Sequence, residues 1–143
     1  MPEQNLQNHV QRVPGFLTLG LVLLVTFIGS AVNLYLSLGD HQRVYSASLV
    51  LVLTGSVLVG TFFARIFALK AQDRAIRAEE NLRHFVLTGR LLDPRLSIQQ
   101  IIGLRFASDA EFPALAQRAA EQGLAQKDIK AAVKSWRADF HRV

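Results

Sequence analysis

Two uncharged apolar stretches near the start of the chain constrain its fold more than any other feature. They cover residues 15–38 and 44–64, and only the short segment 39–43 separates them. A helix needs about 20 apolar residues to cross the roughly 30 Å hydrocarbon core of a bilayer. In lipid every backbone amide must pair within its own segment, so each stretch should be helical. We therefore predict a transmembrane helical hairpin over 14–64, with helices at about 14–38 and 44–64 and a polar N-terminal segment, 1–13, before it.

The distribution of positive charge predicts the orientation of this hairpin. Of the 16 Lys and Arg residues, only Arg12 and Arg43 precede Arg65. Positively charged flanks of membrane spans stay in the cytoplasm. We therefore expect residues 65–143 to be cytoplasmic, and two crossings return the N-terminus to the same side.

A cleaved signal peptide is the competing interpretation of the first apolar stretch. Gly29, Ser30 and Ala31 resemble a small-residue cleavage site. The stretch is longer than a typical signal-peptide core, however, and a single arginine precedes it. We favour an uncleaved helix, and the intact mass of the purified protein distinguishes the two.

Each apolar stretch carries small or weakly polar side chains along one helical face. Residues three or four apart lie on the same side of a helix. Small residues let helices approach closely in lipid, and hydroxyl groups can hydrogen-bond across the contact. We predict packing through Thr26, Ser30 and Asn33 on the first helix and through Ser56, Gly60 and Ala64 on the second. The alternative is that Thr26, Ser30, Asn33 and Ser37 line a pore in an oligomer.

Residues 65–143 predict a helical tail. The second helix should continue to about residue 88, since no Gly or Pro interrupts it before Gly89. Three shorter helices should follow. Ser97 with Gln100 and Ser108 with Glu111 have the spacing of capping boxes that open the first two. The last is expected at about 126–141, with an apolar stripe formed by Ile129, Val133, Trp136 and Phe140. The expected fold is thus all-α, a transmembrane hairpin whose second helix extends into a small cytoplasmic helical domain.

Basic residues form the other candidate contact surface. A basic amphipathic helix that contains Trp can lie on an anionic bilayer. The competing interpretation is that Trp136 belongs to the core of the tail, because the preceding helices also need apolar surface to bury against. The residues expected to contact the membrane surface or a partner are Arg65, Lys70, Arg74 and Arg77 on the long helix and Lys127, Lys130, Lys134, Trp136 and Arg137 on the last.

Residues that would carry chemistry are scarce. The chain has no Cys, and its four His residues lack the spacing of metal ligands. Glu79 and Glu80 lie in a charge-rich helical segment, where salt bridges are the default. We therefore expect no enzyme activity, catalytic residue, cofactor or metal site. Nucleic acid is an unlikely partner because acidic residues interrupt the basic ones and no recognition motif is present.

Several segments resemble a family of small bacterial membrane proteins that is defined only as a domain of unknown function. The resemblance covers nearly the whole chain. It is carried by residues 4–9, 64–74, 104–109, 129–137 and the ending that includes Asp139, Arg142 and Val143. It implies a multi-pass protein of the bacterial inner membrane with a helical tail, and it supplies no activity or cofactor.

These features together favour a non-catalytic membrane protein that acts as an anchor, scaffold or accessory subunit of a larger assembly. The expected partners are the bilayer, including its anionic lipids, and either further copies of the chain or a larger membrane protein complex. The alternative function is an oligomeric channel or permeability factor.

Overall fold

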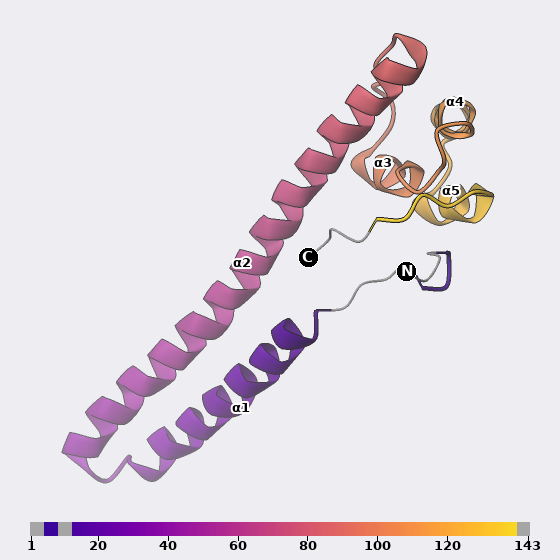
Figure 1. Ribbon diagram of the computed structural model, residues 1–143. Helices are drawn as coiled ribbons and strands as arrows, with labels where there is room; N and C mark the ends of the chain where they lie inside the picture. The colour runs from indigo at the N-terminus through magenta and orange to yellow at the C-terminus, as the bar shows by residue number, and fades with distance from the viewer. Residues whose placement is uncertain (1–4, 9–12, 140–143) are drawn as a thin grey trace. The chain divides into compact units, whose positions relative to one another are not determined.

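The computed structural model describes residues 5–8 and 13–139 (Figure 1). Over these residues the fold is all-helical, as predicted, with no β-strand and a single isolated antiparallel bridge between Ala107 and Trp136. The helices are α1 (Pro14–Leu36), α2 (His41–Thr88), α3 (Ile98–Leu104), α4 (Phe112–Gln122) and α5 (Gln126–Ala132).

The chain divides into two compact units. We call Arg12–Ala68 the hairpin unit and the part that contains Leu69–Val143 the tail unit. The long helix α2 contributes to both units, since the division falls between Ala68 and Leu69.

The hairpin unit consists of α1 and the apolar part of α2. Pro14 occupies the first turn of α1, where its missing N–H leaves no hydrogen bond unmade. The Asp40 carboxylate caps α2 and accepts hydrogen bonds from the N–H groups of Gln42 at 3.0 Å and Arg43 at 3.2 Å. Both helices are long and apolar enough to cross a membrane by length and composition.

In the tail unit, α2 ends where the backbone turns into the left-handed region. Gly89 has φ +72°, a conformation that glycine adopts without steric cost. Its N–H donates to the Phe85 carbonyl at 2.7 Å and so satisfies one of the last free carbonyls of the helix. The chain then turns back toward α3.

The core of the tail unit forms around α3. Leu104, Phe106, Phe112 and Ile129 are its largest fully buried side chains. Gly103 lets α5 approach α3 closely, because a Cβ atom at this position would lie 3.2 Å from Ile129 Cγ2 and 3.3 Å from the Gln126 carbonyl oxygen. The short helices thus bury one another.

The prediction for the last helix is wrong over residues 133–139. The chain leaves the helix at Val133, which is extended. The cause is pairing with the segment before α4, since the Ser108 N–H donates to the Ser135 carbonyl at 3.1 Å and the Arg137 N–H donates to the Phe106 carbonyl at 2.8 Å. Trp136 consequently lies on this extended segment, with its ring 5.0 Å from that of Phe106. The predicted stripe also included Phe140, which lies outside the described residues.

One of the two predicted capping boxes is present. At α3 the Ser97 hydroxyl accepts from the Gln100 N–H, and the Gln100 side chain accepts from the Ser97 N–H. At α4 the helix begins later, at Phe112. The Glu111 carboxylate does accept from the Ser108 N–H at 3.3 Å, but it also binds the N–H groups of residues 134 and 135.

Gly103→Val should lower the free energy of unfolding of the tail unit by about 1–3 kcal/mol, because the added side chain must displace α5 from α3. The measurement is urea unfolding of the full chain in mild detergent, followed by the fluorescence of Trp136, the single Trp of the sequence. Ala114→Val on the exposed side of α4 is the control, with an expected loss of about 0.5 kcal/mol. Equal losses for the two variants would contradict the close approach of α3 and α5.

Candidate functional site

The contact between α1 and α2 in the hairpin unit runs along a stripe of α1 with alternating spacings of four and three residues. Ser30 is buried there, and its hydroxyl lies 3.0 Å from that of Thr54. Gly55 faces the Phe27 ring at the next level of the hairpin. The buried or half-buried residues of α1 and its C-cap are Phe16, Gly20, Leu23, Phe27, Ser30, Leu34 and Ser37.

Of the residues predicted to pack the two helices together, Ser30 is buried in this contact. Thr26, Asn33, Ser56, Gly60 and Ala64 are exposed. Ser56 and Gly60 line a pocket together with Phe27 and Gly55. The packing role of the five exposed residues therefore stays a prediction. The stripe on α1 consists mainly of bulky apolar side chains, which bury more surface than small polar ones.

The predicted pore lining is only partly exposed. Ser30 and Ser37 are buried, whereas Thr26 and Asn33 are exposed at the edge of the same face of α1. The hydroxyls of Thr26 and Ser37 donate to the backbone carbonyls of Val22 and Asn33 at 2.8 and 2.7 Å. The four side chains therefore do not form one continuous exposed polar face.

The basic residues predicted as a contact surface separate into different environments. In the hairpin unit the Arg65 guanidinium lies over the Phe16 ring, 5.4 Å from its centre. In the tail unit Lys70, Arg74 and Arg77 are exposed on α2. The prediction that one helix carries Lys127, Lys130, Lys134 and Arg137 is wrong, because α5 ends at Ala132. Their contact with a membrane surface or a partner stays a prediction. Lys130 lies over the Phe106 ring at 5.5 Å.

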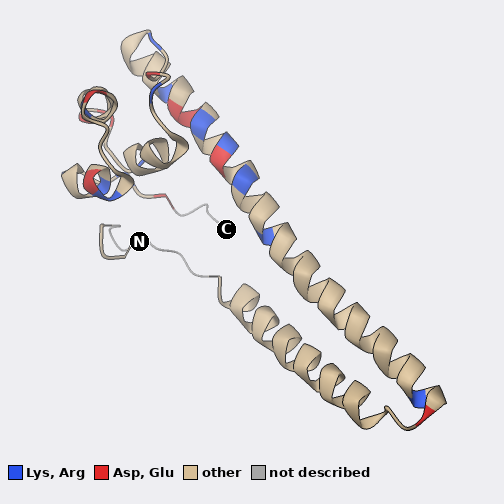
Figure 2. Cartoon of the chain, turned by 180° about the vertical axis from the view of Figure 1, so that it is seen from behind, with Lys and Arg blue, Asp and Glu red and all other residues tan. Residues whose placement is uncertain are grey.

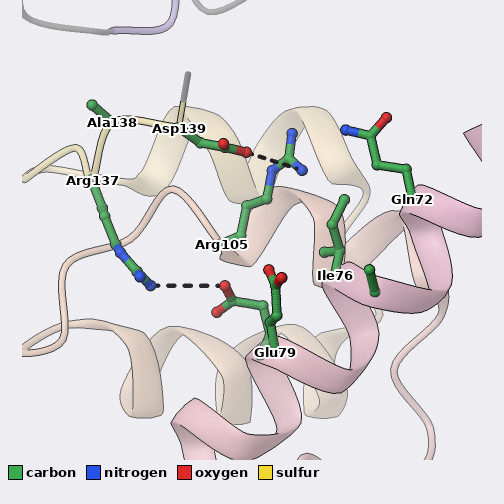
Figure 3. Close-up of a pocket in the computed structure, with 9 residues that line it drawn as sticks. Gln72, Ile76, Glu79, Arg105, Arg137, Ala138 and Asp139 are labelled. Atoms are coloured by element: carbon green, nitrogen blue, oxygen red, sulfur yellow. Dashed lines mark ion pairs between the residues drawn. The ribbon is translucent and has the colours of Figure 1, made fainter. Parts of the chain in front are cut away.

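A polar cavity of about 460 Å³ in the tail unit is the best-formed candidate site (Figure 3). It lies between α2, Arg105 after α3 and the extended C-terminal segment. Its charged and amide side chains are Gln72, Glu79, Glu80, Arg105, Arg137 and Asp139. Figure 3 shows the side chains of Arg105 and Asp139 directed toward one another across it.

Ion pairs neutralise most of the charge around this cavity. The buried Arg105 guanidinium lies 3.2 Å from the Asp139 carboxylate. Glu80 is also buried, and its two carboxylate oxygens lie 3.0 Å from Arg83 and 3.8 Å from Arg137. Such pairing offsets the cost of removing charges from water, and it does not leave a strongly charged binding surface.

Arg83 connects α2 to the loop between α3 and α4. Its guanidinium pairs with Asp109 at 2.7 Å and donates to the Ala107 carbonyl at 2.6 Å. It also lies 4.3 Å from the centre of the Phe112 ring. Together with Glu80, this side chain attaches α2 to the rest of the tail unit.

Glu111 anchors the extended C-terminal segment. Its carboxylate accepts hydrogen bonds from the N–H groups of Lys134 at 3.1 Å and Ser135 at 3.0 Å, besides the one from Ser108. Burial raises the pKa of Glu111, but these backbone hydrogen bonds lower it by more, and the net shift is downward. The ionised carboxylate therefore stabilises the fold.

The residues of this site that matter most were not selected from the sequence. Glu80 and Arg83 have the three-residue spacing of a helical ion pair, which is a weak signal. Asp109, Arg105 and Asp139 come from segments distant from α2 and have no local pattern that predicts their ion pairs. The described residues contain no group of His, Cys, Asp and Glu suited to hold a metal ion.

The whole chain, residues 1–143, matches the model of a family described as a family of unknown function (DUF6526). The chain belongs to this family. No curated protein and no solved structure matches it. The family assignment confirms the expected family of unknown function along the whole chain, and it assigns no activity to the polar cavity.

Glu80→Gln should lower the free energy of unfolding of the tail unit by about 1.5–3 kcal/mol, because it removes the charge that pairs with the buried Arg83. Glu79→Gln makes the same change one residue earlier on the exposed surface, where the expected effect is about 0.5 kcal/mol or less. Urea unfolding followed by Trp136 fluorescence measures both. If the two variants are equally stable, the buried pair does not stabilise the protein.

Acidification should release the C-terminal segment before it unfolds the helices. Because the pKa of Glu111 is lower in the folded protein, its contribution is complete above the ordinary Glu pKa of about 4.3 and is lost as the pH falls through the folded value. Trp136 fluorescence should report this loss. In Glu111→Gln the acid-induced change should disappear, and an unchanged pH profile in that variant would assign the transition to another group.

Proposed function

We propose that this chain is a non-catalytic, two-span protein of a bacterial inner membrane. In this proposal the hairpin unit is inserted in the bilayer with both termini in the cytoplasm. The tail unit serves there as a scaffold or accessory subunit of a membrane assembly.

The observation that carries the proposal is the exposed apolar surface of the hairpin unit. Leucine, valine, isoleucine and phenylalanine side chains surround α1 and the first part of α2, and many are more than half exposed, such as Leu21, Val25 and Phe62. Soluble monomers rarely expose apolar patches of more than a few hundred Å². Hydrocarbon chains would cover this surface without cost.

The distribution of charge along α2 supports the same proposal. Figure 2 shows no charged residue along α2 between its first turn and the position of Arg65, and many beyond it. Arg65, Lys70, Arg74 and Arg77 follow the apolar run directly. Basic residues at this position favour the cytoplasmic side, and each attracts anionic lipid by about 1 kcal/mol.

An anchor accounts for the geometry better than a channel does. A pore needs a continuous polar face, but Ser30 and Ser37 are buried in the hairpin contact while Thr26 and Asn33 are exposed. The described part of α1 contains no charged side chain that could attract an ion. The polar cavity of the tail unit favours a structural role as well, because most of its acidic and basic groups, all except Glu79, form ion pairs.

The test is the sidedness of two single cysteines in the otherwise cysteine-free chain. Gln42→Cys at the start of α2 should react with a membrane-impermeant maleimide in intact spheroplasts. Ala114→Cys on α4 should react only after permeabilisation. The wild-type chain should remain in the membrane pellet after extraction at alkaline pH.

Release at alkaline pH, or labelling of both cysteines from outside, would contradict the proposal. Unchanged Trp136 fluorescence in both variants is the control that the tail unit remains folded.

A further inference from the structure

One face of α2 in the tail unit is apolar and exposed, and Ala75 at its edge also lines the polar cavity. We call this face the alanine face. The opposite side of the helix carries Ile76 and Glu80, which are buried against the rest of the tail unit. On the alanine face, Leu82 is 63% exposed and Phe85 is 50% exposed. The alanine face consists of Ala71, Ala75, Ala78, Leu82 and Phe85.

The spacing of the alanine face is that of a coiled-coil seam. Its members follow one another at alternating intervals of four and three residues, which place them at successive a and d positions of a heptad. Alanine at such positions lets two helices approach closely, at the short end of the usual range of about 8–10 Å between axes. Leu82 and Phe85 would supply the larger apolar contact at the end of the seam.

The charges beside the seam indicate what covers it. Arg74 occupies a g position and Glu79 the following e position, five residues later. In a parallel two-stranded coiled coil, a g residue faces the e residue of the next heptad on the other helix, and opposite charges there set partner and orientation. Arg74 and Glu79 are both exposed, and neither forms an ion pair with another described residue, although Glu79 also lines the polar cavity.

We propose that the alanine face binds the alanine face of a second copy of this chain, forming a parallel, in-register coiled coil. The two-fold axis then places Arg74 of each copy beside Glu79 of the other, so the same charge pair forms twice. The parallel direction rests on the proposed function, because two copies inserted in one membrane with the same orientation present α2 in the same direction. In an antiparallel pair, e positions lie beside e positions and g positions beside g positions. Arg74 of one copy would then not lie beside Glu79 of the other.

Cysteine cross-linking in native membranes tests the contact. Ala78→Cys and Ala75→Cys lie on the seam, where a parallel in-register pair brings identical residues together. Arg77→Cys is exposed on the same helix but lies beside the seam. Mild oxidation should convert the two seam variants to a covalent dimer at least about fivefold more efficiently than the Arg77→Cys control.

Charge exchange tests the orientation on the Ala78→Cys background. Arg74→Glu should reduce the dimer yield by about fivefold. This factor is the largest effect on a binding constant that the loss of an exposed ion pair is expected to have. Glu79→Arg should do the same, and the double exchange should restore the yield. Restoration excludes simple misfolding of the single variants, and Trp136 fluorescence checks the tail unit independently.

Three results would overturn the proposal. These are equal cross-linking of the seam and control positions, adducts of Ala78→Cys with a different polypeptide in place of a dimer, and failure of the double exchange to restore the yield. Alkaline extraction of the same membranes separates this test from that of the proposed function. If the chain stays in the membrane but does not cross-link, the proposed dimer is wrong and the proposed membrane anchor stands. If a cross-linked dimer is released at alkaline pH, the anchor is wrong and the dimer stands.

Discussion

Apolar surface that the fold itself leaves uncovered is the constraint on which the rest of the structure depends. In the hairpin unit, α1 buries one narrow stripe against α2, and its remaining sides carry large apolar groups. Their burial is worth about 25 cal/mol per Å² of surface removed from water, so a covering from outside the unit is strongly favoured. The tail unit has a core of its own, around Leu104 and Ile129.

The tail unit supplements its small core with carboxylates that form ion pairs and hydrogen bonds. A domain of this size buries a modest fraction of its surface, so specific polar contacts have large effects on its stability. Glu80 faces the guanidinium groups of Arg83 and Arg137, and Glu111 accepts three backbone N–H groups. Both carboxylates connect segments that are distant in the sequence. They hold the extended C-terminal segment, which carries Trp136, against the helices.

Local patterns in the sequence predicted the helices, and long-range pairing accounts for what they missed. The apolar runs, Pro14 and the Ser97–Gln100 box act within a few residues, and the structure places α1, α2 and α3 accordingly. The apolar stripe at 129–136 predicted a longer last helix, but hydrogen bonds from Lys134 and Ser135 to Glu111 hold this segment extended. The polar cavity escaped prediction for the same reason, since Arg105 and Asp139 meet only in the folded unit.

The composition of the alanine face of α2 indicates that a partner covers this face. Alanine is the strongest helix former, so Ala71, Ala75 and Ala78 alone could reflect helix propensity. Propensity does not explain Leu82 and Phe85, which continue the same spacing and remain at least half exposed. Charged residues such as Arg77 lie beside this face and not on it. A partner that covers the face removes the cost of this exposure, and the charges of Arg74 and Glu79 favour a second copy of the chain over an unrelated protein.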